Sequence, residues 1–345
     1  MSADRHARGP HPLPLFWELA RLHIGDDRTR MKALTAAVER YQSAPKPPLR
    51  ATLRSVATSG AAALLAPQKN GDGRNVVLVP SLVNPPTILD LDERRSLLHM
   101  LARRGFAAHL IDWGKPGSSE RRFDLDVYVT ARLEPLLSAI NRPVVVGYCL
   151  GGILAMAAAA RGKLSALATL ATPWRFDGYP AERRAELRKW WVQTRPAAER
   201  LGVLPMALLQ PAFWSLDPGA PSAKFLRYGA MPDGDAARLF EAVEDWANGG
   251  APIPLPLMDE AIDGLFGRNV TGRGEWTVGG TSVTPEAIDI PWLNLPATGD
   301  RIVPTAAAPP SPNDHSVAAG HVGMIVGSRA PELLHAPLVT WLRSL

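Results

Sequence analysis

The chain has little of several features that would mark a function directly. It has one cysteine in 345 residues, so no disulfide can form within it, which fits a reducing compartment. Its longest apolar stretch, residues 153–160, is much shorter than the roughly 20 residues that span a bilayer. No His/Cys/Asp cluster has the spacing of metal ligands, and no Gly-x-Gly-x-x-Gly follows a predicted strand. We therefore expect no metal, no cofactor and no transmembrane segment.

The chain also carries little net charge. The formal net charge is +5, and acids balance the basic residues locally, as in residues 92–95 (DERR). Without a basic stripe and stacking aromatics we expect no nucleic-acid partner. A mildly basic surface can still attract an anionic substrate such as a coenzyme A thioester. The N-terminus carries no apolar h-region with a cleavage site, so we expect a cytoplasmic protein.

Short β-branched runs alternate with helical segments through much of the chain. Residues 75–79 (NVVLV) are typical of a buried parallel strand, and residues 93–104 predict a helix that Gly105 closes. This alternation indicates an α/β protein with a mostly parallel sheet covered on both faces. Further strands are expected at 106–112, 143–146, 164–170 and 291–296, and further helices at 14–43, 126–140, after Cys149 and at 331–345.

The alternation stops between residues 177 and 288, where the sequence is helical, rich in aromatics and interrupted by Pro/Gly clusters. A long helical insertion before the last strand is typical of a cap over an α/β core. We therefore expect four parts. They are an N-terminal helical extension (1–70), the first part of the core (71–176), a helical cap (177–288) and the second part of the core (289–345).

The strongest motif is residues 144–152 (VVVGYCLGG), followed by an alanine-rich helix. A strand, a Gly-X-Cys-X-Gly turn and a helix form the nucleophile elbow of the α/β-hydrolase fold. The tight turn requires Gly147 and Gly151, and it points the side chain of Cys149 away from the sheet at a helix N-terminus. We interpret Cys149 as the nucleophile rather than as an inert buried thiol.

A thiol nucleophile needs a base and an acid that orients the base, and this fold supplies them in the order nucleophile, acid, histidine. His321, in a glycine-flanked loop before the last helix, is the expected base. His315 and His335 are the alternatives, and His335 falls inside the predicted helix. Asp300 follows the predicted strand 291–296 and is the expected acid. Asp314 is the alternative, in a turn where aspartate often only caps.

The backbone N–H groups of Leu150 and Val83 are the expected oxyanion donors. Leu150 follows the nucleophile, and Val83 lies in the loop after the strand 75–79. The aromatic cap residues Trp190, Trp191 and Trp214 are interpreted as lining a dry acyl channel, or else as ordinary cap core.

With these residues placed, the chain resembles the catalytic subunit of polyhydroxyalkanoate synthases, of the compact type that works with a second, helical subunit. The resemblance implies a Cys149–His321–Asp300 triad that polymerises 3-hydroxyacyl-CoA through an acyl thioester. It also implies an acyl-CoA substrate, association with polyester granules, and assembly as a homodimer or with a helical partner subunit. The matching motifs are residues 82–91 (LVNPPTILDL), 110–114 (LIDWG), 147–152 (GYCLGG), 171–173 (ATP), 299–304 (GDRIVP) and 320–321 (GH).

The chain departs from that pattern at Arg301, where such synthases typically carry a histidine. A cation at this position can bind a carboxylate or phosphate, so Arg301 is a candidate substrate-binding residue. It also keeps open a thioesterase or esterase with the same triad, in which water takes the acyl group. A catalytically silent granule-associated protein that kept the fold is a third interpretation.

Overall fold

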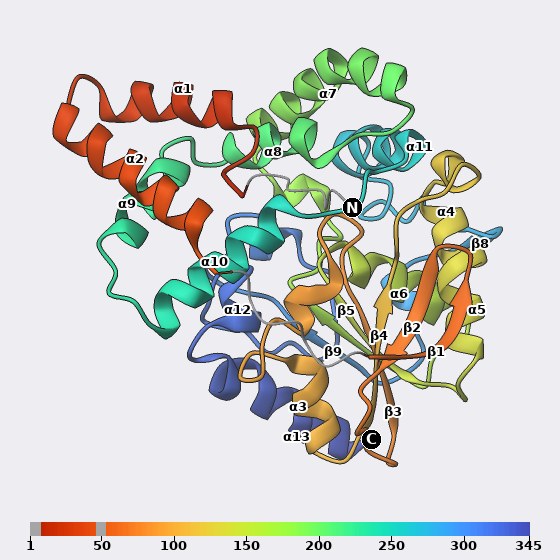
Figure 1. Ribbon diagram of the computed structural model, residues 1–345. Coiled ribbons are helices and arrows are strands. Elements are labelled where there is room, and N and C mark those ends of the chain that lie inside the picture. Colours follow the sequence, from red (N-terminus) through yellow and green to blue (C-terminus); the bar gives the residue numbers. More distant parts are fainter. Residues whose placement is uncertain (1–7, 46–52) are drawn as a thin grey trace. The chain divides into compact units, whose positions relative to one another are not determined.

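The protein is described by a computed structural model that covers residues 8–45 and 53–345 (Figure 1). The chain divides into two compact units, one formed by Met1–Leu49 and Pro205–Gly250 and the other by Arg50–Leu204 and Ala251–Leu345. This division differs from the four parts expected above. Residues 205–250, expected within the cap, group instead with the N-terminal helices.

The larger unit contains a sheet of seven strands. They are β1 (Arg54–Ser59), β2 (Ala62–Ala66), β3 (Asn75–Val79), β4 (Ala107–Asp112), β5 (Val144–Tyr148), β6 (Ala166–Leu170) and β9 (Trp292–Leu295). Their order is β1-β2-β4-β3-β5-β6-β9, with parallel pairing from β4 to β9 and antiparallel pairing of β1 and β2 at one edge. Every residue of β5 and β6 is buried, as expected for central parallel strands. The predicted α/β fold with a mostly parallel sheet is confirmed.

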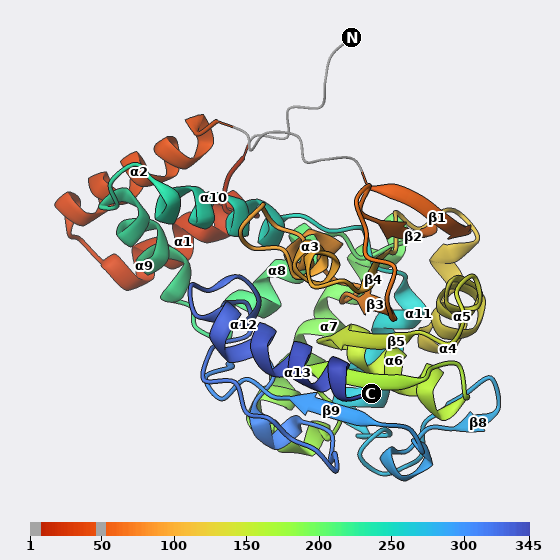
Figure 2. The same ribbon diagram turned by 90° about the horizontal axis from the view of Figure 1, so that it is seen from below.

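Helices cover both faces of this sheet. The α-helices of the larger unit are α3 (Leu97–Arg103), α4 (Leu125–Tyr128), α5 (Glu134–Ser138), α6 (Leu150–Ala160), α7 (Ala181–Leu201), α11 (Leu255–Asp259), α12 (Gly323–Val326) and α13 (Ala336–Ser344). Figure 2 shows α3 and α13 on one side of the sheet and α5 and α6 on the other. α6 packs against β5 and β6, and it is apolar on all sides because nearly all of it is buried.

Short 3-10 and π-helical turns complete the larger unit. The 3-10 turns are η1 (Pro86–Leu89), η2 (Glu120–Arg122), η4 (Phe176–Gly178), η6 (Pro285–Ala287) and η7 (Thr305–Ala307). The π-helical turns are η3 (Val129–Leu133), η5 (Glu260–Gly267) and η8 (Pro331–His335). A two-stranded ribbon, β7 (Thr277–Val278) with β8 (Thr281–Ser282), lies between η5 and η6 in the chain.

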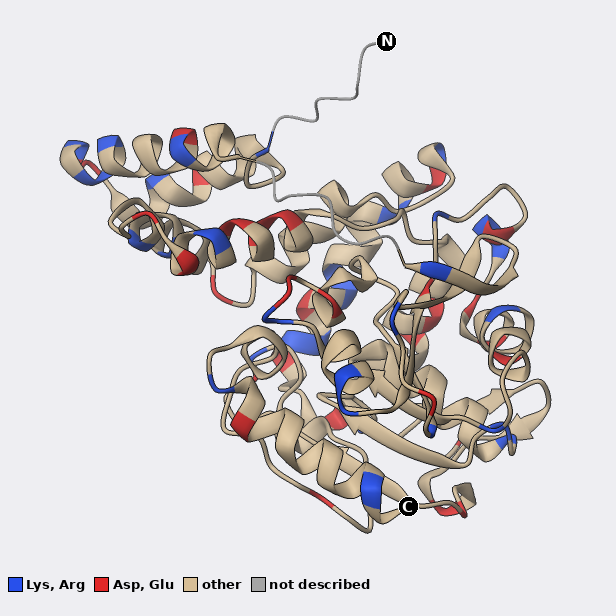
Figure 3. Cartoon of the chain, turned by 60° about the horizontal axis from the view of Figure 1, so that its bottom comes forward, with Lys and Arg blue, Asp and Glu red and all other residues tan. Residues whose placement is uncertain are grey.

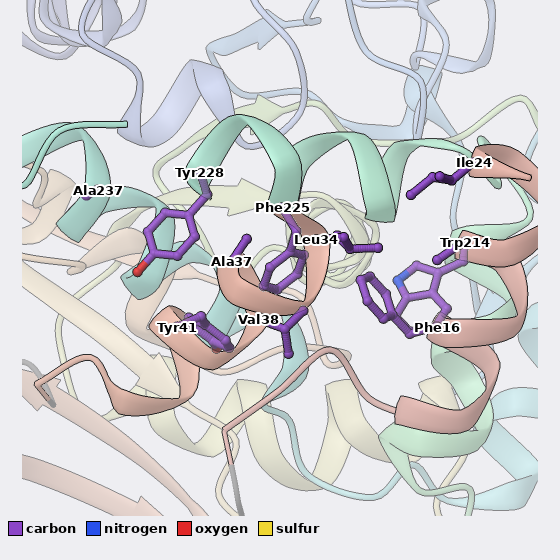
Figure 4. Close-up of a cluster of buried hydrophobic side chains, with 11 residues drawn as sticks. Phe16, Ile24, Leu34, Ala37, Val38, Tyr41, Trp214, Phe225, Tyr228 and Ala237 are labelled. Atoms are coloured by element: carbon purple, nitrogen blue, oxygen red, sulfur yellow. The ribbon is translucent and has the colours of Figure 1, made fainter. Parts of the chain in front are cut away.

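The smaller unit is helical. It contains α1 (Leu13–Ile24), α2 (Arg28–Ser43), α8 (Met206–Trp214), α9 (Ala220–Gly229) and α10 (Asp235–Asn248). Aromatic residues from all five helices contribute to its core (Figure 4). Phe225 is fully buried, and the centroid of its ring lies 5.4 Å from that of Phe16 and 5.6 Å from that of Tyr41. α2 packs against α9, which explains why two segments far apart in sequence fold as one unit.

Four predicted helical segments change in detail. The segment 14–43 is α1 and α2, because α1 ends at Gly25, which has a positive φ, and Asp27 caps α2 by accepting a hydrogen bond from the Arg30 amide. α3 begins at Leu97, four residues after the predicted start, because Ser96 caps it by accepting a hydrogen bond from the His99 amide. The helix expected at 126–140 is α4, η3 and α5 in succession, and the one expected at 331–345 is η8 followed by α13. The β1–β2 hairpin and the β7–β8 ribbon were not predicted.

Charged residues are dispersed over the described chain. Figure 3 shows Lys and Arg interspersed with Asp and Glu along the helices and loops. Within residues 8–45 and 53–345, no helix is both long and apolar enough to cross a membrane.

Candidate active site

The elbow lies where β5 passes into α6. Cys149 has φ 54° and ψ −127°, a positive φ that is uncommon for a residue other than glycine. Its N–H donates to the carbonyl of Leu170 at 2.9 Å, and its own carbonyl accepts from the N–H of Gly152 at 2.9 Å. The turn therefore ends the strand abruptly and leaves Cys149 partly exposed at the N-terminus of α6.

The glycines of the elbow are required by close packing. A Cβ on Gly147 would lie 2.5 Å from Cα of Gly152, and one on Gly151 would lie 2.2 Å from the carbonyl oxygen of Val79. Both distances are shorter than a side chain tolerates. The contact of Gly151 with Val79 also brings the start of α6 against the end of β3.

His321 and Asp300 come together on two loops beyond β9. Nδ1 of His321 contacts Oδ2 of Asp300 at 2.6 Å, and both residues are buried. Oδ1 of Asp300 accepts the N–H groups of Ile302 and Val303 at 2.7 and 2.9 Å, so its carboxylate is held on both oxygens. The N–H of Gly299 donates to the carbonyl of Ala319 at 2.9 Å, which joins the two loops directly.

Cys149 lies within electrostatic reach of this pair. Because Nδ1 of His321 contacts Asp300, Nε2 is the ring nitrogen available to the sulfur. Burial alone would lower the pKa of His321, but the charge of Cys149 and hydrogen bonds to Asp300 and Cys149 outweigh it and raise that pKa to about 10. The imidazole is therefore held as a cation whenever the sulfur is an anion.

The alternative acid and bases lie elsewhere. Asp314 accepts a hydrogen bond from Nδ2 of Asn294 at 2.9 Å, and the other end of Asn294 accepts from the hydroxyl of Thr169. Asp314 thus belongs to a polar network with Asn294 of β9 and Thr169 of β6. His315 is exposed in its loop, and His335 is buried between η8 and α13. Among the described residues, none of these three is hydrogen-bonded to Cys149.

The expected oxyanion donors flank the elbow. Leu150 is the first residue of α6, where N–H groups have no partner within the helix. Val83 lies in the loop after β3, and its N–H donates to Oγ of Ser81 at 3.3 Å, a long bond. Their role as donors to an oxyanion stays a prediction.

The predicted substrate-binding residues differ in their surroundings. Arg301 is exposed and directly follows Asp300. Trp214 belongs to the core of the smaller helical unit, where its ring lies 6.2 Å from that of Phe16. Trp191 is buried and donates from Nε1 to Asp259 at 2.9 Å, and Trp190 lies against it. Substrate binding by these residues stays a prediction.

Two tyrosines near the site had no expected role. Tyr148 is fully buried, and its hydroxyl donates to the carbonyl of His321. Burial raises the pKa of Tyr179 well above its usual value, and the charges of Cys149 and Asp300 raise it further, so Tyr179 also lies within electrostatic reach of the site. Tyr148 stands in the elbow motif itself, but its contact with His321 spans 173 positions and leaves no local pattern.

In the described ranges, no group of three or more His, Cys, Asp or Glu side chains is arranged to hold a metal ion.

Fold and site together define an α/β-hydrolase fold with a cysteine at the elbow. Solved structures agree on the fold. BpoC of Mycobacterium tuberculosis, described as a non-heme bromoperoxidase, aligns with a TM-score of 0.51 at 15% identity, over 87% of this chain and 99% of its own. The carboxylesterase CesB of Bacillus subtilis aligns with a TM-score of 0.50 at 10% identity, over 92% of this chain and 98% of its own.

In sequence, the chain is similar to the PhaC subunits of poly(3-hydroxyalkanoate) polymerases. It is 25% identical to PhaC of Haloferax mediterranei, over 77% of this chain and 58% of that protein. It is 26% identical to PhaC of Allochromatium vinosum, over 77% of this chain and 80% of that protein. The chain thus spans less than two thirds of the haloarchaeal relative's length. No family model matches it.

Proposed function

We propose that the protein is an acyltransferase that polymerises 3-hydroxyacyl-CoA, with Cys149 as nucleophile, His321 as base and Asp300 as the group that orients His321. The observation that carries the proposal is the 2.6 Å contact of His321 with Asp300, within electrostatic reach of Cys149 on a strand-to-helix elbow. The similarity to PhaC polymerase subunits supports this substrate class. No cofactor is needed, because the coenzyme A thioester is itself activated.

The first half-reaction forms the acyl thioester. The Cys149 proton passes to His321, and the thiolate attacks the substrate carbonyl carbon. The N–H groups of Leu150 and Val83 donate to the oxyanion of the tetrahedral intermediate. When that intermediate collapses, the bond to coenzyme A breaks, and His321 returns its proton to the departing sulfur. The acyl group remains on Cys149 as a thioester of similar energy.

The second half-reaction depends on how acylation changes His321. The pKa of His321 is raised by the charge of Cys149 and by hydrogen bonds to Asp300 and Cys149. Acylation removes both effects of Cys149, so that pKa falls toward the range of a general base. The imidazole then accepts the proton of the 3-hydroxyl group of a second 3-hydroxyacyl-CoA, whose oxygen attacks the thioester carbonyl carbon. The bond from that carbon to Cys149 breaks, the departing sulfur takes the proton back from His321, and the acyl group is esterified to the second unit. Asp300 keeps the ring oriented throughout.

The remaining parts of the proposal concern partners and location. Arg301, exposed beside Asp300, is proposed to bind a substrate phosphate or carboxylate. The protein is proposed to act in the cytoplasm at polyester granules, as a homodimer or with a helical partner subunit, by analogy with the polyhydroxyalkanoate synthases that it resembles.

One observation favours a second candidate, a hydrolase with the same three residues. Arg301 replaces the histidine typical of the synthases, and a cation beside the triad acid can alter how the acyl-enzyme is discharged. Water would then attack the thioester in place of the hydroxyl, and the product would be a free acid.

Product analysis with 3-hydroxybutyryl-CoA separates the two candidates. We expect wild-type protein to release coenzyme A and to accumulate oligoesters that elongate with time, and we expect Cys149→Ala to do neither. Release of coenzyme A with only free 3-hydroxybutyrate would overturn the synthase and favour the hydrolase. Because a partner subunit is part of the proposal, the assay is repeated with an extract of the source cells added.

A further inference from the structure

Tyr148 precedes the proposed nucleophile in the chain and contacts the proposed base with its side chain. It is the last residue of β5 and the neighbour of Cys149 in the chain. Its hydroxyl donates to the carbonyl of His321 at 3.2 Å, and its ring lies 5.0 Å from the imidazole ring at an interplanar angle of 32°. We propose that Tyr148 is a positioning residue that holds both the main chain and the ring of His321 in place for Cys149.

The argument begins with where each residue is attached. His321 lies in a loop before α12, and loops are more mobile than the strands they follow. Tyr148 belongs to β5, which pairs with β3 on one side and β6 on the other and is buried along its whole length. The hydrogen bond and the ring contact therefore hold His321 against β5, a strand that is paired on both sides.

The two contacts of Tyr148 act on different parts of His321. The hydroxyl fixes the main-chain carbonyl, and the tilted ring limits rotation of the imidazole about its side-chain bonds. The contact with Asp300 fixes the imidazole from its Nδ1 edge. Tyr148 and Asp300 together determine where Nε2 points, and Nε2 is the atom that exchanges a proton with Cys149.

Tyr148 does not take part in proton transfer itself. Burial raises the pKa of its hydroxyl well above the usual value, and the charges of Cys149 and Asp300 raise it further, so the hydroxyl stays protonated and acts as a donor. The titratable groups that interact with His321 are Cys149 and Asp300, and Tyr179 senses the same two charges.

The test exploits the fact that the chain has one cysteine, so that alkylation by iodoacetamide reports on Cys149 alone. Tyr148→Phe removes the hydroxyl and keeps the ring, whereas Tyr148→Leu removes both contacts. Tyr128→Phe is the matched control, because Tyr128 is a buried tyrosine of the same unit whose ring contacts are with Trp113 and Phe123. Alkylation rates are measured from pH 5 to pH 10, with a thermal melt for each variant.

We expect Tyr148→Phe to slow alkylation at neutral pH by roughly fivefold, the usual effect of losing one hydrogen bond. Tyr148→Leu should slow it by about a hundredfold, as expected for a displaced catalytic base, and should move the midpoint of its pH profile upward. Tyr128→Phe should match the wild type. Folded Tyr148→Phe and Tyr148→Leu proteins with wild-type pH profiles would overturn the proposal. If Tyr148→Leu does not fold, the profile of Tyr148→Phe decides alone.

This inference rests on the proposed pairing of Cys149 with His321, but its test does not need a substrate. If the protein fails to release coenzyme A while Tyr148→Phe still shifts thiol reactivity, the proposed function is wrong and the positioning role stands. If activity is present and thiol reactivity is indifferent to Tyr148, the positioning role is wrong and the proposed function stands.

Discussion

At the scale of single residues, Cys149 combines an unfavourable backbone with a favourable electrostatic setting. Its positive φ costs on the order of 1–3 kcal/mol for a side chain other than glycine. The two backbone hydrogen bonds to Leu170 and Gly152 help to maintain that conformation. In return the sulfur stands at the N-terminus of α6, within electrostatic reach of His321.

The role of Asp300 can be separated from that of Asp314 by matched substitutions. Asp300→Asn replaces the charge that supports the His321 cation, so we expect kcat/KM to fall by on the order of 10²–10⁴. The pKa of His321, followed by NMR, should fall as well. Asp314→Asn alters only the network with Asn294 and should leave kcat/KM near the wild-type value. A larger loss of activity in Asp314→Asn than in Asp300→Asn would reverse the assignment.

The three triad candidates could be predicted from sequence because each lies in a local pattern. Cys149 is surrounded by the elbow glycines, Asp300 follows a strand, and His321 precedes a helix between glycines. Tyr148 could not be assigned a role in the same way. Its function depends on a contact with a distant loop, which only the folded chain reveals.

At the scale of elements, the buried parallel strands were the most predictable. The run 75–79 coincides with β3, because a strand buried on both faces is apolar throughout. The hairpin of β1 and β2 was missed because β1 is an edge strand with mostly exposed or half-buried residues and several Ser and Thr side chains. The ribbon of β7 and β8 left one signal, the turn at Gly279 and Gly280, both with positive φ.

His335, at the junction of η8 and α13, is expected to make the stability of the protein depend on pH. Burial, together with Arg104 and Arg103, lowers the pKa of His335 from 6.5 to about 4. Between these values the unfolded chain binds a proton that the folded chain does not, so stability falls as the pH is lowered from about 6.5 to about 4. We expect a loss of about 3 kcal/mol across that window from this group.

Urea denaturation at a series of pH values measures this effect. His335→Leu removes the titrating group, and Nε2 of His335 has no hydrogen-bond partner among the described residues, so the variant should flatten the pH dependence without a large loss at pH 7. His315→Gln, a change in an exposed loop, serves as the control and should keep the wild-type slope. An unchanged slope in His335→Leu would contradict the assignment of the effect to this side chain.

At the scale of the whole molecule, the division of the chain was the least predictable feature. The sequence suggests one continuous cap over 177–288, because helical and aromatic segments recur along it on both sides of the Pro/Gly clusters. Packing instead separates Pro205–Gly250, which joins the N-terminal helices, from the flanking segments, which belong to the sheet unit. Which helices share a core depends on contacts such as that of Phe225 with Phe16, and periodicity alone does not specify partners.

We therefore expect a destabilising substitution in the aromatic core of the smaller unit to affect its helices together. Phe225→Ala empties the centre of its aromatic core and should cost about 3–5 kcal/mol. Hydrogen exchange is expected to speed up in α1, α2 and α9 together, with smaller changes in β5 and β6. Leu22→Ala is the control, since Leu22 is 75% exposed and should change stability by no more than about 0.5 kcal/mol. Faster exchange confined to α9 would contradict a shared core.

Whether Cys149 carries the acyl group decides the proposed mechanism, and peptide mass spectrometry measures this. Wild-type protein is mixed with 3-hydroxybutyryl-CoA, quenched in acid within seconds and digested for peptide mapping. We expect the acyl mass on the peptide that contains Cys149, released by neutral hydroxylamine as a thioester should be, and no adduct in Cys149→Ala. Release of coenzyme A by Cys149→Ala at the wild-type rate, or an adduct on another residue, would contradict the account.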